Sequence, residues 1–218
     1  MNFLLVSEIF SSIQGEGEVI GIPSNFIRLA GCNLRCIYCD TKYSWNHGVK
    51  ISVDQIIKQV DDSIKLVTIT GGEPLLQDIH PLVTRLKQLG HIICVETNGT
   101  IAPNESLLQL VDYWSVSPKL SNALVKYKLR FPVEKVRDNI WYKFVVCNLT
   151  DIEEIKKFVR ACRIPPDKVI LQPNGLLSDE KYFDLAKLVF EYIITQKLPF
   201  RFIPQVHRII WGRGVRKK

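Results

Sequence analysis

Short apolar runs alternate with longer amphipathic runs along most of this chain of 218 residues. Strands bury short apolar segments, whereas helices repeat apolar positions every three or four residues, so the two kinds of run can be distinguished. The apolar runs predict strands over residues 25–31, 65–72, 91–99, 113–119, 140–148 and 168–173. The amphipathic runs predict helices over residues 52–63, 75–90, 104–111, 151–162 and 179–197.

This alternation predicts an α/β fold with parallel strands, because a helix returns the chain to the start of the next strand. The predicted strands are apolar along their whole length, which is typical of parallel strands covered on both faces. Six or so such strands form either an open partial barrel or a doubly wound sheet. A basic, irregular stretch lies at about 120–139, and we expect an extended segment with a basic tail at 201–218. One domain over residues 1–218 is expected.

Glycine, proline and polar residues cluster directly after several of the predicted strands. In a parallel sheet the carboxyl ends of the strands lie at one edge, and ligands bind there. We therefore expect one rim to carry Gly31–Cys32, Gly71–Pro74, Glu96–Thr100, Ser117–Lys119 and Gln172–Gly175.

Three cysteines fall within the segment "AGCNLRCIYCDT", at Cys32, Cys36 and Cys39. Three thiols in one short loop cannot all form local disulfides. The N-terminal residues lack the basic leader of a secretory signal, so we expect a cytoplasmic protein with reduced thiols. Clustered cysteines then predict metal ligands or catalytic groups. Buried, unreactive thiols are expected at the remaining positions, Cys94, Cys147 and Cys162.

Two kinds of metal site are consistent with this loop. One is a structural zinc ion with His47 as the fourth ligand, although C-x3-C-x2-C with one distant histidine fits the usual pairs of zinc ligands poorly. The other is a four-iron cluster, for which sulfur ligands are the rule. Three thiolates leave one iron without a protein ligand, and a small molecule with an amine and a carboxylate can chelate that iron.

The segment "CNLRCIYC", with Tyr38 before its last cysteine, and "GGEP" after the second predicted strand together resemble the radical S-adenosylmethionine (radical SAM) superfamily. The resemblance implies a single-domain, partial (β/α)6 barrel of the TIM-like kind, with a cluster-binding loop at residues 31–45. It implies a [4Fe-4S] cluster on Cys32, Cys36 and Cys39, and S-adenosylmethionine as cofactor. In that superfamily the reduced cluster cleaves the cofactor to a 5'-deoxyadenosyl radical, which takes hydrogen from the substrate.

Residues 8–32, "EIFSSIQGEGEVIGIPSNFIRLAGC", resemble the opening of the 7-carboxy-7-deazaguanine synthase family. A glycine-flanked turn exposes backbone groups to a flat heterocycle, and an arginine fork suits a carboxylate. Taken alone, a tight turn and a surface arginine would explain the same residues. The resemblance implies contacts with a pterin substrate at Gln14, Gly15, Glu16, Arg28, Thr70 and His207.

The same resemblance implies the other site residues. A hard cation prefers an oxygen ligand, and the Thr41 hydroxyl is the candidate for Mg²⁺, with a turn-forming threonine as the alternative. Contacts with S-adenosylmethionine are implied for Tyr38, Asp40, Gly72, Glu73, Ser117, Lys119, Gln172 and Asn174. The chain departs from the family's Q-x-H-K ending, because Arg208 follows His207 and a basic tail continues to Lys218.

The resemblance implies a lyase that converts 6-carboxy-5,6,7,8-tetrahydropterin to 7-carboxy-7-deazaguanine with loss of ammonia, in the biosynthesis of queuosine and other 7-deazapurines. A flavodoxin-like electron donor and a homodimer are also implied. One alternative is a glycyl-radical activating enzyme, which shares the cysteine loop and "GGEP" but does not need the opening at 8–32. A non-catalytic zinc-binding module is the other, and it leaves "GGEP" unexplained.

Net charge and hydropathy limit the kinds of binding partner that can be expected. The formal net charge is +7, and part of the excess comes from the tail "GRGVRKK". A basic chain attracts anions, but the sequence contains no recognition module for nucleic acids, so no nucleic-acid partner is expected. No apolar run approaches the roughly 20 residues that span a bilayer, so no membrane association is expected either.

Overall fold

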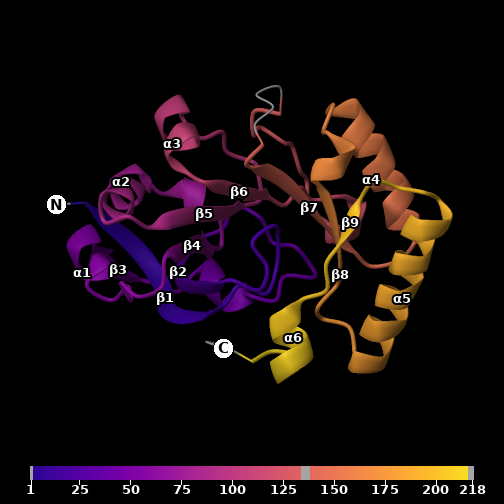
Figure 1. The fold of residues 1–218 in the computed structure, drawn as a ribbon, viewed down its shortest axis with the longest axis horizontal. Helices are drawn as coiled ribbons and strands as arrows, with labels where there is room; N and C mark the ends of the chain where they lie inside the picture. Colours follow the sequence, from indigo (N-terminus) through magenta and orange to yellow (C-terminus); the bar gives the residue numbers. More distant parts are fainter. Residues whose placement is uncertain (1, 134–137, 216–218) are drawn as a thin grey trace.

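The computed structural model describes residues 2–133 and 138–215. Within this part of the chain, nine strands form one sheet in the order β3-β1-β2-β4-β5-β6-β7-β8-β9 (Figure 1). The strands are β1 (Phe3–Ile13), β2 (Pro23–Leu29), β3 (Val49–Ser52), β4 (Leu66–Gly71), β5 (Ile92–Thr97), β6 (Tyr113–Val116), β7 (Ile140–Val146), β8 (Val169–Pro173) and β9 (Arg201–Phe202).

The neighbouring strands from β2 to β9 are parallel, as the strand-and-helix alternation predicts. This open parallel sheet confirms the α/β fold class. β1 pairs antiparallel with β2 and β3, and neither β1 nor β3 was among the predicted strands. The register sets Glu8 beside Arg28, and Arg28 beside Thr70. Polar side chains are thereby aligned near the carboxyl ends of β2 and β4.

The helices α2 to α5 follow the strands and lie outside the sheet (Figure 1). Side-chain caps fix some helix starts: Ser52 accepts from the backbone N–H of Gln55, and Asn104 from that of Leu107. No helix in the described part of the chain is long and apolar enough to cross a membrane. The helices are α1 (Val53–Ile57), α2 (His80–Gln88), α3 (Glu105–Leu110), α4 (Thr150–Ala161), α5 (Asp179–Thr195) and α6 (Val206–Trp211).

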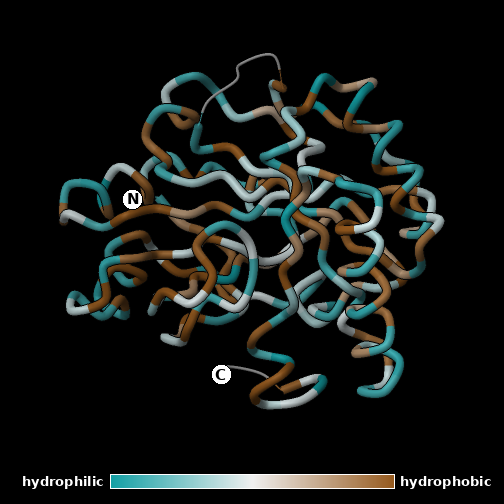
Figure 2. The backbone as a smooth tube through the Cα atoms, turned by 45° about the vertical axis from the view of Figure 1, so that its right-hand side comes forward, coloured by the Kyte–Doolittle hydropathy of each residue, from teal (hydrophilic) through white to brown (hydrophobic). Residues whose placement is uncertain are grey.

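The two faces of the parallel strands differ in polarity. Alternate side chains such as Val67, Val95 and Phe144 belong to the main hydrophobic core with the helices. In Figure 2, hydrophilic positions interrupt the hydrophobic stretches along the chain. The prediction of strands that are apolar throughout is therefore wrong for the inner face, because that face lines a cavity. The residues between the core positions are Thr68, Thr70, Cys94, Glu96, Ser115, Lys143 and Gln172.

The C-terminal segment is not extended as predicted. Only β9 pairs with β8, and the chain then turns into α6. The backbone N–H of Gln205, just before this helix, donates to the Tyr182 hydroxyl at 2.7 Å. A partner on α5 therefore fixes the start of α6, and a local pattern cannot predict such a contact.

Two predicted features lie partly outside the described residues. The end of the basic tail, 216–218, is one of them. The irregular basic stretch also includes residues 134–137, which are not described. In the described part of that stretch, a short 3₁₀ turn at Ser121–Ala123 precedes an extended segment without strand pairing.

Candidate functional site

A cavity of about 490 Å³ opens at the carboxyl ends of the parallel strands. The turn after β1, the cysteine loop and α6 supply the walls that the strands do not. Every site residue predicted from the sequence lines this cavity except Glu73 and Asn174. The inner-face side chains that line it are Arg28 from β2, Thr70 from β4, Glu96 from β5, Ser115 from β6, Lys143 from β7 and Gln172 from β8.

The cysteine loop lines one wall of the cavity with Cys32, Cys36 and Cys39. The backbone N–H of Cys39 donates to the Cys36 carbonyl at 3.2 Å, so the loop turns tightly between its last two thiols. On its inner side, the backbone N–H of Glu73 donates to the Gly31 carbonyl at 2.8 Å. A Cβ on Gly72 would lie 2.0 Å from the same carbonyl oxygen. Only glycine lets "GGEP" approach the loop this closely.

The three thiols fit an iron-sulfur cluster better than zinc. Zinc–sulfur bonds of about 2.3 Å place two sulfur ligands about 3.8 Å apart. In the described part of the chain, the three cysteine sulfur atoms do not all lie within 4.8 Å of one another, and no group of that size includes His47. Three more widely spaced thiols can each bind a different iron of a four-iron cluster. Burial raises the pKa of Cys32 and Cys36, so metal binding must displace their protons.

The Glu73 side chain does not face the cavity. Its carboxylate is fully buried and accepts from the Thr97 hydroxyl at 2.7 Å, from the backbone N–H of Asn98 at 2.6 Å and from that of Leu75 at 3.0 Å. These bonds tie the end of β4 to the end of β5. Only the glycines of "GGEP" line the cavity, so their backbone is the part that can contact a ligand.

A buried ion pair joins Glu16 to Lys143 at the centre of the inner face. Gln172 and Gln205 also donate to the Glu16 carboxylate, at 3.1 and 2.7 Å. Burial alone would raise the pKa of Glu16, but the Lys143 ammonium, aided by His207, holds that pKa below its usual value. Glu16 in turn raises the pKa of Lys143 against the effect of burial. Both groups are therefore charged at neutral pH.

A second polar network surrounds Glu96. The Thr70 hydroxyl donates to Glu96 Oε2 at 2.7 Å, and the Gln14 amide donates to Oε1 at 3.1 Å. The same Gln14 amide lies 3.4 Å from Thr68 Oγ1. Two predicted residues thus hold the carboxylate of Glu96, which the sequence placed on the rim without a predicted contact.

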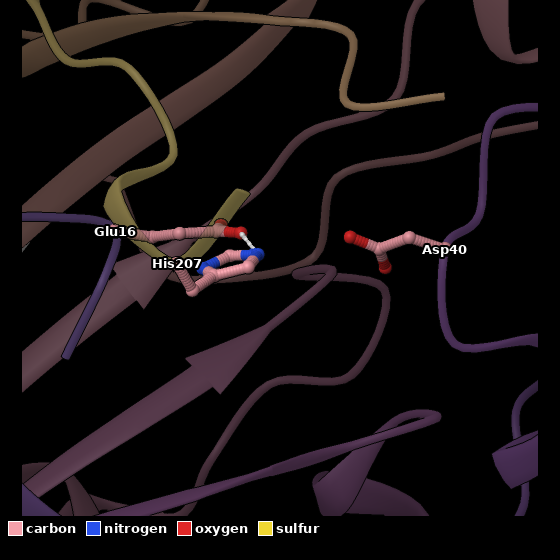
Figure 3. A group of neighbouring side chains, drawn as sticks. All are labelled: Glu16, Asp40 and His207. Atoms are coloured by element: carbon pink, nitrogen blue, oxygen red, sulfur yellow. Dashed lines mark ion pairs between the residues drawn. The ribbon is translucent and has the colours of Figure 1, made fainter. Parts of the chain in front are cut away.

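Glu16, Asp40 and His207 form the group of possible metal ligands within 4.8 Å. Figure 3 shows Asp40 reaching toward Glu16 and His207 from the cysteine loop, on the opposite side of the gap. The His207 ring lies 3.9 Å from Glu16. Because Lys143 already neutralises Glu16, this carboxylate is a poor ligand for a second cation. Asp40 is the more available oxygen donor.

The other predicted residues have protein partners as well. The Arg28 guanidinium donates to Glu8 at 2.7 Å. The Lys119 ammonium donates to Ser117 Oγ at 2.7 Å. The Asn174 amide, outside the cavity, lies 3.5 Å from the Cys147 sulfur. Cys94 is buried as expected, whereas Cys147 and Cys162 are half-buried.

Arg208 anchors α6 to the loop after β8. The side chain is buried and donates to the carbonyls of Gly175 and Leu177 at 2.9 and 2.8 Å. It also lies 3.7 Å from the centre of the Tyr182 ring. This anchoring places Gln205 and His207 at the cavity. Arg208 lines the cavity as well, beside these two residues.

The sequence reasoning placed Glu96 on the rim without giving it a contact, and it missed Lys143 and Gln205. A signal was available for the first two, because each is a charged residue in an otherwise apolar strand, two positions from another inner-face residue. Gln205 carried no such signal. Its role follows from the packing of α6, which the sequence pattern did not predict.

The fold and the site define a protein of the radical SAM class, and residues 26–121 match the radical SAM superfamily. The 7-carboxy-7-deazaguanine synthase of Pyrobaculum aerophilum is 41% identical over 216 residues, which cover 96% of this chain and 95% of the relative. The synthase of Hyperthermus butylicus is 35% identical, with 95% and 92% covered. This chain belongs to the 7-carboxy-7-deazaguanine synthase family.

A solved structure agrees with this assignment. The crystal structure of QueE from Escherichia coli is similar with a TM-score of 0.70 and 26% sequence identity. The similarity covers 94% of this chain and 95% of that one. The partial-barrel fold expected from the cysteine motif is thereby confirmed, and the near full-length matches favour this family over the glycyl-radical activating enzymes.

Glu18, in the turn after β1, is half-buried and carries a carboxyl group with one buried oxygen. Its Oε2 is buried without a hydrogen-bond partner among the described residues, and Cys94 lies 3.8 Å from Oε1. Burial, reinforced by the Glu96 carboxylate, raises the pKa of Glu18 to about 7. The folded protein keeps this proton above the pH at which the unfolded chain loses it. Its contribution to stability is therefore complete below about pH 4.5 and is lost as the pH rises to about 7.

Replacing Glu18 with Gln, which mimics the protonated acid, removes this pH dependence. We expect the free energy of unfolding of Glu18→Gln, relative to the wild type, to rise by about 2 kcal/mol between pH 5 and pH 8. Urea unfolding at both pH values measures the difference. Glu180→Gln, at an exposed position on α5, is the control and should show no such change. An equal difference at both pH values would contradict the burial of this acid.

Removing the Arg208 anchor should destabilise the protein. Arg208→Ala leaves two carbonyls without their donor, so we expect a loss of about 3 kcal/mol in the free energy of unfolding. Arg208→Lys keeps the charge but not the fork, and about 1 kcal/mol should be lost. The exposed Arg85 on α2 is the control, with a loss below about 0.5 kcal/mol on substitution by Ala. Urea unfolding measures all three, and equal effects at both positions would rule out the anchor.

Proposed function

We propose that this radical SAM enzyme converts 6-carboxy-5,6,7,8-tetrahydropterin to 7-carboxy-7-deazaguanine with loss of ammonia. The near full-length identity of 41% to a synthase of that name carries the proposal. The cavity supports it, because the substrate residues expected from the opening segment lie around the same space as the three thiols. Its volume of about 490 Å³ suits a small molecule.

Cys32, Cys36 and Cys39 would hold the [4Fe-4S] cluster. When bound, the cluster supplies the electron that cleaves S-adenosylmethionine to the 5'-deoxyadenosyl radical. Around the thiols, the Gly72 backbone, the Ser117 hydroxyl and the Lys119 ammonium offer polar contacts to the amino acid part of this cofactor. Tyr38, Asp40 and Gln172 line the same space. We assign Glu73 a positioning role, since its carboxylate is already bonded to the protein.

The substrate would lie against the inner face of the sheet. Glu96 suits the N–H groups of the pterin's pyrimidine ring, and Gln14 and Thr70 hold that carboxylate in place. Arg28 and His207 lie at the cavity wall as donors for a carboxylate. Lys143 keeps Glu16 ionised as an acceptor. These residues would bind and orient the ring at the inner face of the sheet.

Further parts of the proposal concern metal and partners. The Thr41 hydroxyl, with Asp40 beside it, offers the hard oxygen ligands that Mg²⁺ prefers. The ion would bind the substrate carboxylate during the ring contraction. A flavodoxin-like protein would supply the electron and the enzyme would form a homodimer, as the family resemblance implies. We also propose that the enzyme acts in the cytoplasm.

An anaerobic assay tests the reaction. The chain is reconstituted with iron and sulfide, reduced with dithionite and given S-adenosylmethionine, Mg²⁺ and the carboxytetrahydropterin. We expect the deazaguanine product by mass spectrometry, and its complete loss in Cys36→Ala, because that variant lacks a cluster ligand. Cys162→Ala is the control and should retain the activity. Cleavage of S-adenosylmethionine without any pterin turnover would show that the proposed substrate is wrong.

A second assay tests the magnesium site. Thr41→Ala should lower kcat/KM by about tenfold at limiting Mg²⁺, because an oxygen ligand is lost. Saturating Mg²⁺ should restore part of the rate. Thr195→Ala, at an exposed position on α5, should behave as the wild type. If Thr41→Ala shows the wild-type dependence on Mg²⁺, this hydroxyl is not a ligand.

A further inference from the structure

The extended segment at residues 124–131, "LVKYKLRF", alternates between two environments, and we call it the basic strap. Val125, Tyr127, Leu129 and Phe131 are half-buried or buried and pack against the hydrophobic clusters. The intervening residues are exposed, so three cations lie in a row on its outer side. The exposed residues are Leu124, Lys126, Lys128 and Arg130.

Backbone and side-chain hydrogen bonds hold the basic strap on the protein. The backbone N–H groups of Arg130 and Phe131 donate to the Gly99 carbonyl at 2.8 and 3.1 Å. The Tyr127 hydroxyl donates to the Asn98 carbonyl at 2.8 Å. The outward row of cations is therefore displayed by a fixed segment that ends at the carboxyl end of β5.

At its other end, the basic strap meets the outer side of the cysteine loop. The Ile37 backbone N–H donates to the Ala123 carbonyl at 3.2 Å, directly before Leu124. Ile37 is 55% exposed and Leu124 is 72% exposed. Cys36 and Tyr38 line the cavity, whereas Ile37 between them does not. An exposed apolar pair thus lies on the outer side of the loop that presents the thiols inward.

The described residues offer no ionic partner to the cations of the basic strap, Lys126, Lys128 and Arg130. Arg35, also exposed, adds a fourth cation on the cysteine loop. A row of exposed cations around a small apolar centre favours fast, weak association with an acidic protein. Transient encounters between redox proteins bury a small interface, below about 1,200 Å² in total.

RNA is the other polyanion that such a surface could attract. The sequence "KYKLRF" interleaves basic and aromatic residues, a pattern typical of single-strand binding, in which bases stack on aromatic rings. Here Tyr127 and Phe131 pack inward and cannot offer their faces to bases. The exposed centre is aliphatic instead, which suits a protein surface.

We propose that the basic strap, with Ile37 and Leu124, is the surface on which an acidic one-electron carrier protein docks. This rests on the proposed function, because only a cluster held by the three thiols needs an electron from outside. The reduced flavin of the carrier gives one electron to the oxidised cluster and is itself oxidised by one electron, and no bond forms or breaks. The docked flavin would lie against the outer side of the cysteine loop.

Binding of purified flavodoxin to the reconstituted protein at low ionic strength tests the surface. We expect Lys126→Glu/Lys128→Glu/Arg130→Glu to raise the Kd by at least about tenfold, because three attractions become repulsions. The control, Lys157→Glu/Lys181→Glu/Lys187→Glu, makes the same charge change at exposed positions on α4 and α5 and should change the Kd by less than about twofold. Equal weakening in both variants would overturn the proposal.

Electron entry is measured separately from turnover. Reduction of the cluster, followed by its visible absorbance, should slow by about tenfold with flavodoxin in the strap variant and stay unchanged with dithionite. The milder Lys126→Gln/Lys128→Gln should slow it by about threefold, which guards against a folding defect. Tighter binding of a mixed-sequence RNA than of flavodoxin, abolished by the same variant, would make this a nucleic-acid site and overturn the proposal.

The two proposals fail differently. If dithionite supports product formation but the strap variant binds flavodoxin as the wild type does, the docking surface is wrong and the proposed reaction stands. If flavodoxin reduces the cluster through the basic strap but no pterin is consumed, the reaction is wrong and the docking surface stands.

Discussion

The cavity depends on one buried ion pair, between Lys143 on β7 and Glu16 in the turn after β1. Removing two charges from water costs more free energy than their attraction recovers unless other groups satisfy them. Gln172 on β8 and Gln205 before α6 supply those hydrogen bonds. The network forms only when these segments take one arrangement, so it specifies the geometry of the inner face more than it adds to stability.

The cysteine loop is the second constraint, and the protein contacts it from two sides. Inside, the backbone of Gly72 and Glu73 lies against Gly31, where no larger residue fits. Outside, Ile37 is bonded to the residue before the basic strap. The loop thus faces the cavity on one side and solvent on the other.

Helix α6 closes the cavity through contacts that are distant in sequence. Arg208 bonds to the carbonyls after β8, and Tyr182 on α5 holds the backbone of Gln205. The departure from the family's Q-x-H-K ending therefore has a physical role, since the arginine fork reaches two carbonyls at once. This anchoring also fixes the position of His207, so the packing of α6 places its ring beside Glu16.

The sequence by itself determined the alternation of parallel strands and helices from β2 to α5, the three thiols and the glycines of "GGEP", because each depends on spacing along the chain or on glycine's missing side chain. Only the tertiary structure decided that the strands have a polar inner face, that residues 206–211 are helical and that the Glu73 carboxylate points away from the cavity. Contacts between segments that are distant in sequence fix these three features. Glu16 meets Lys143 across 127 positions and Gln205 across 189, and no local pattern encodes such a pairing.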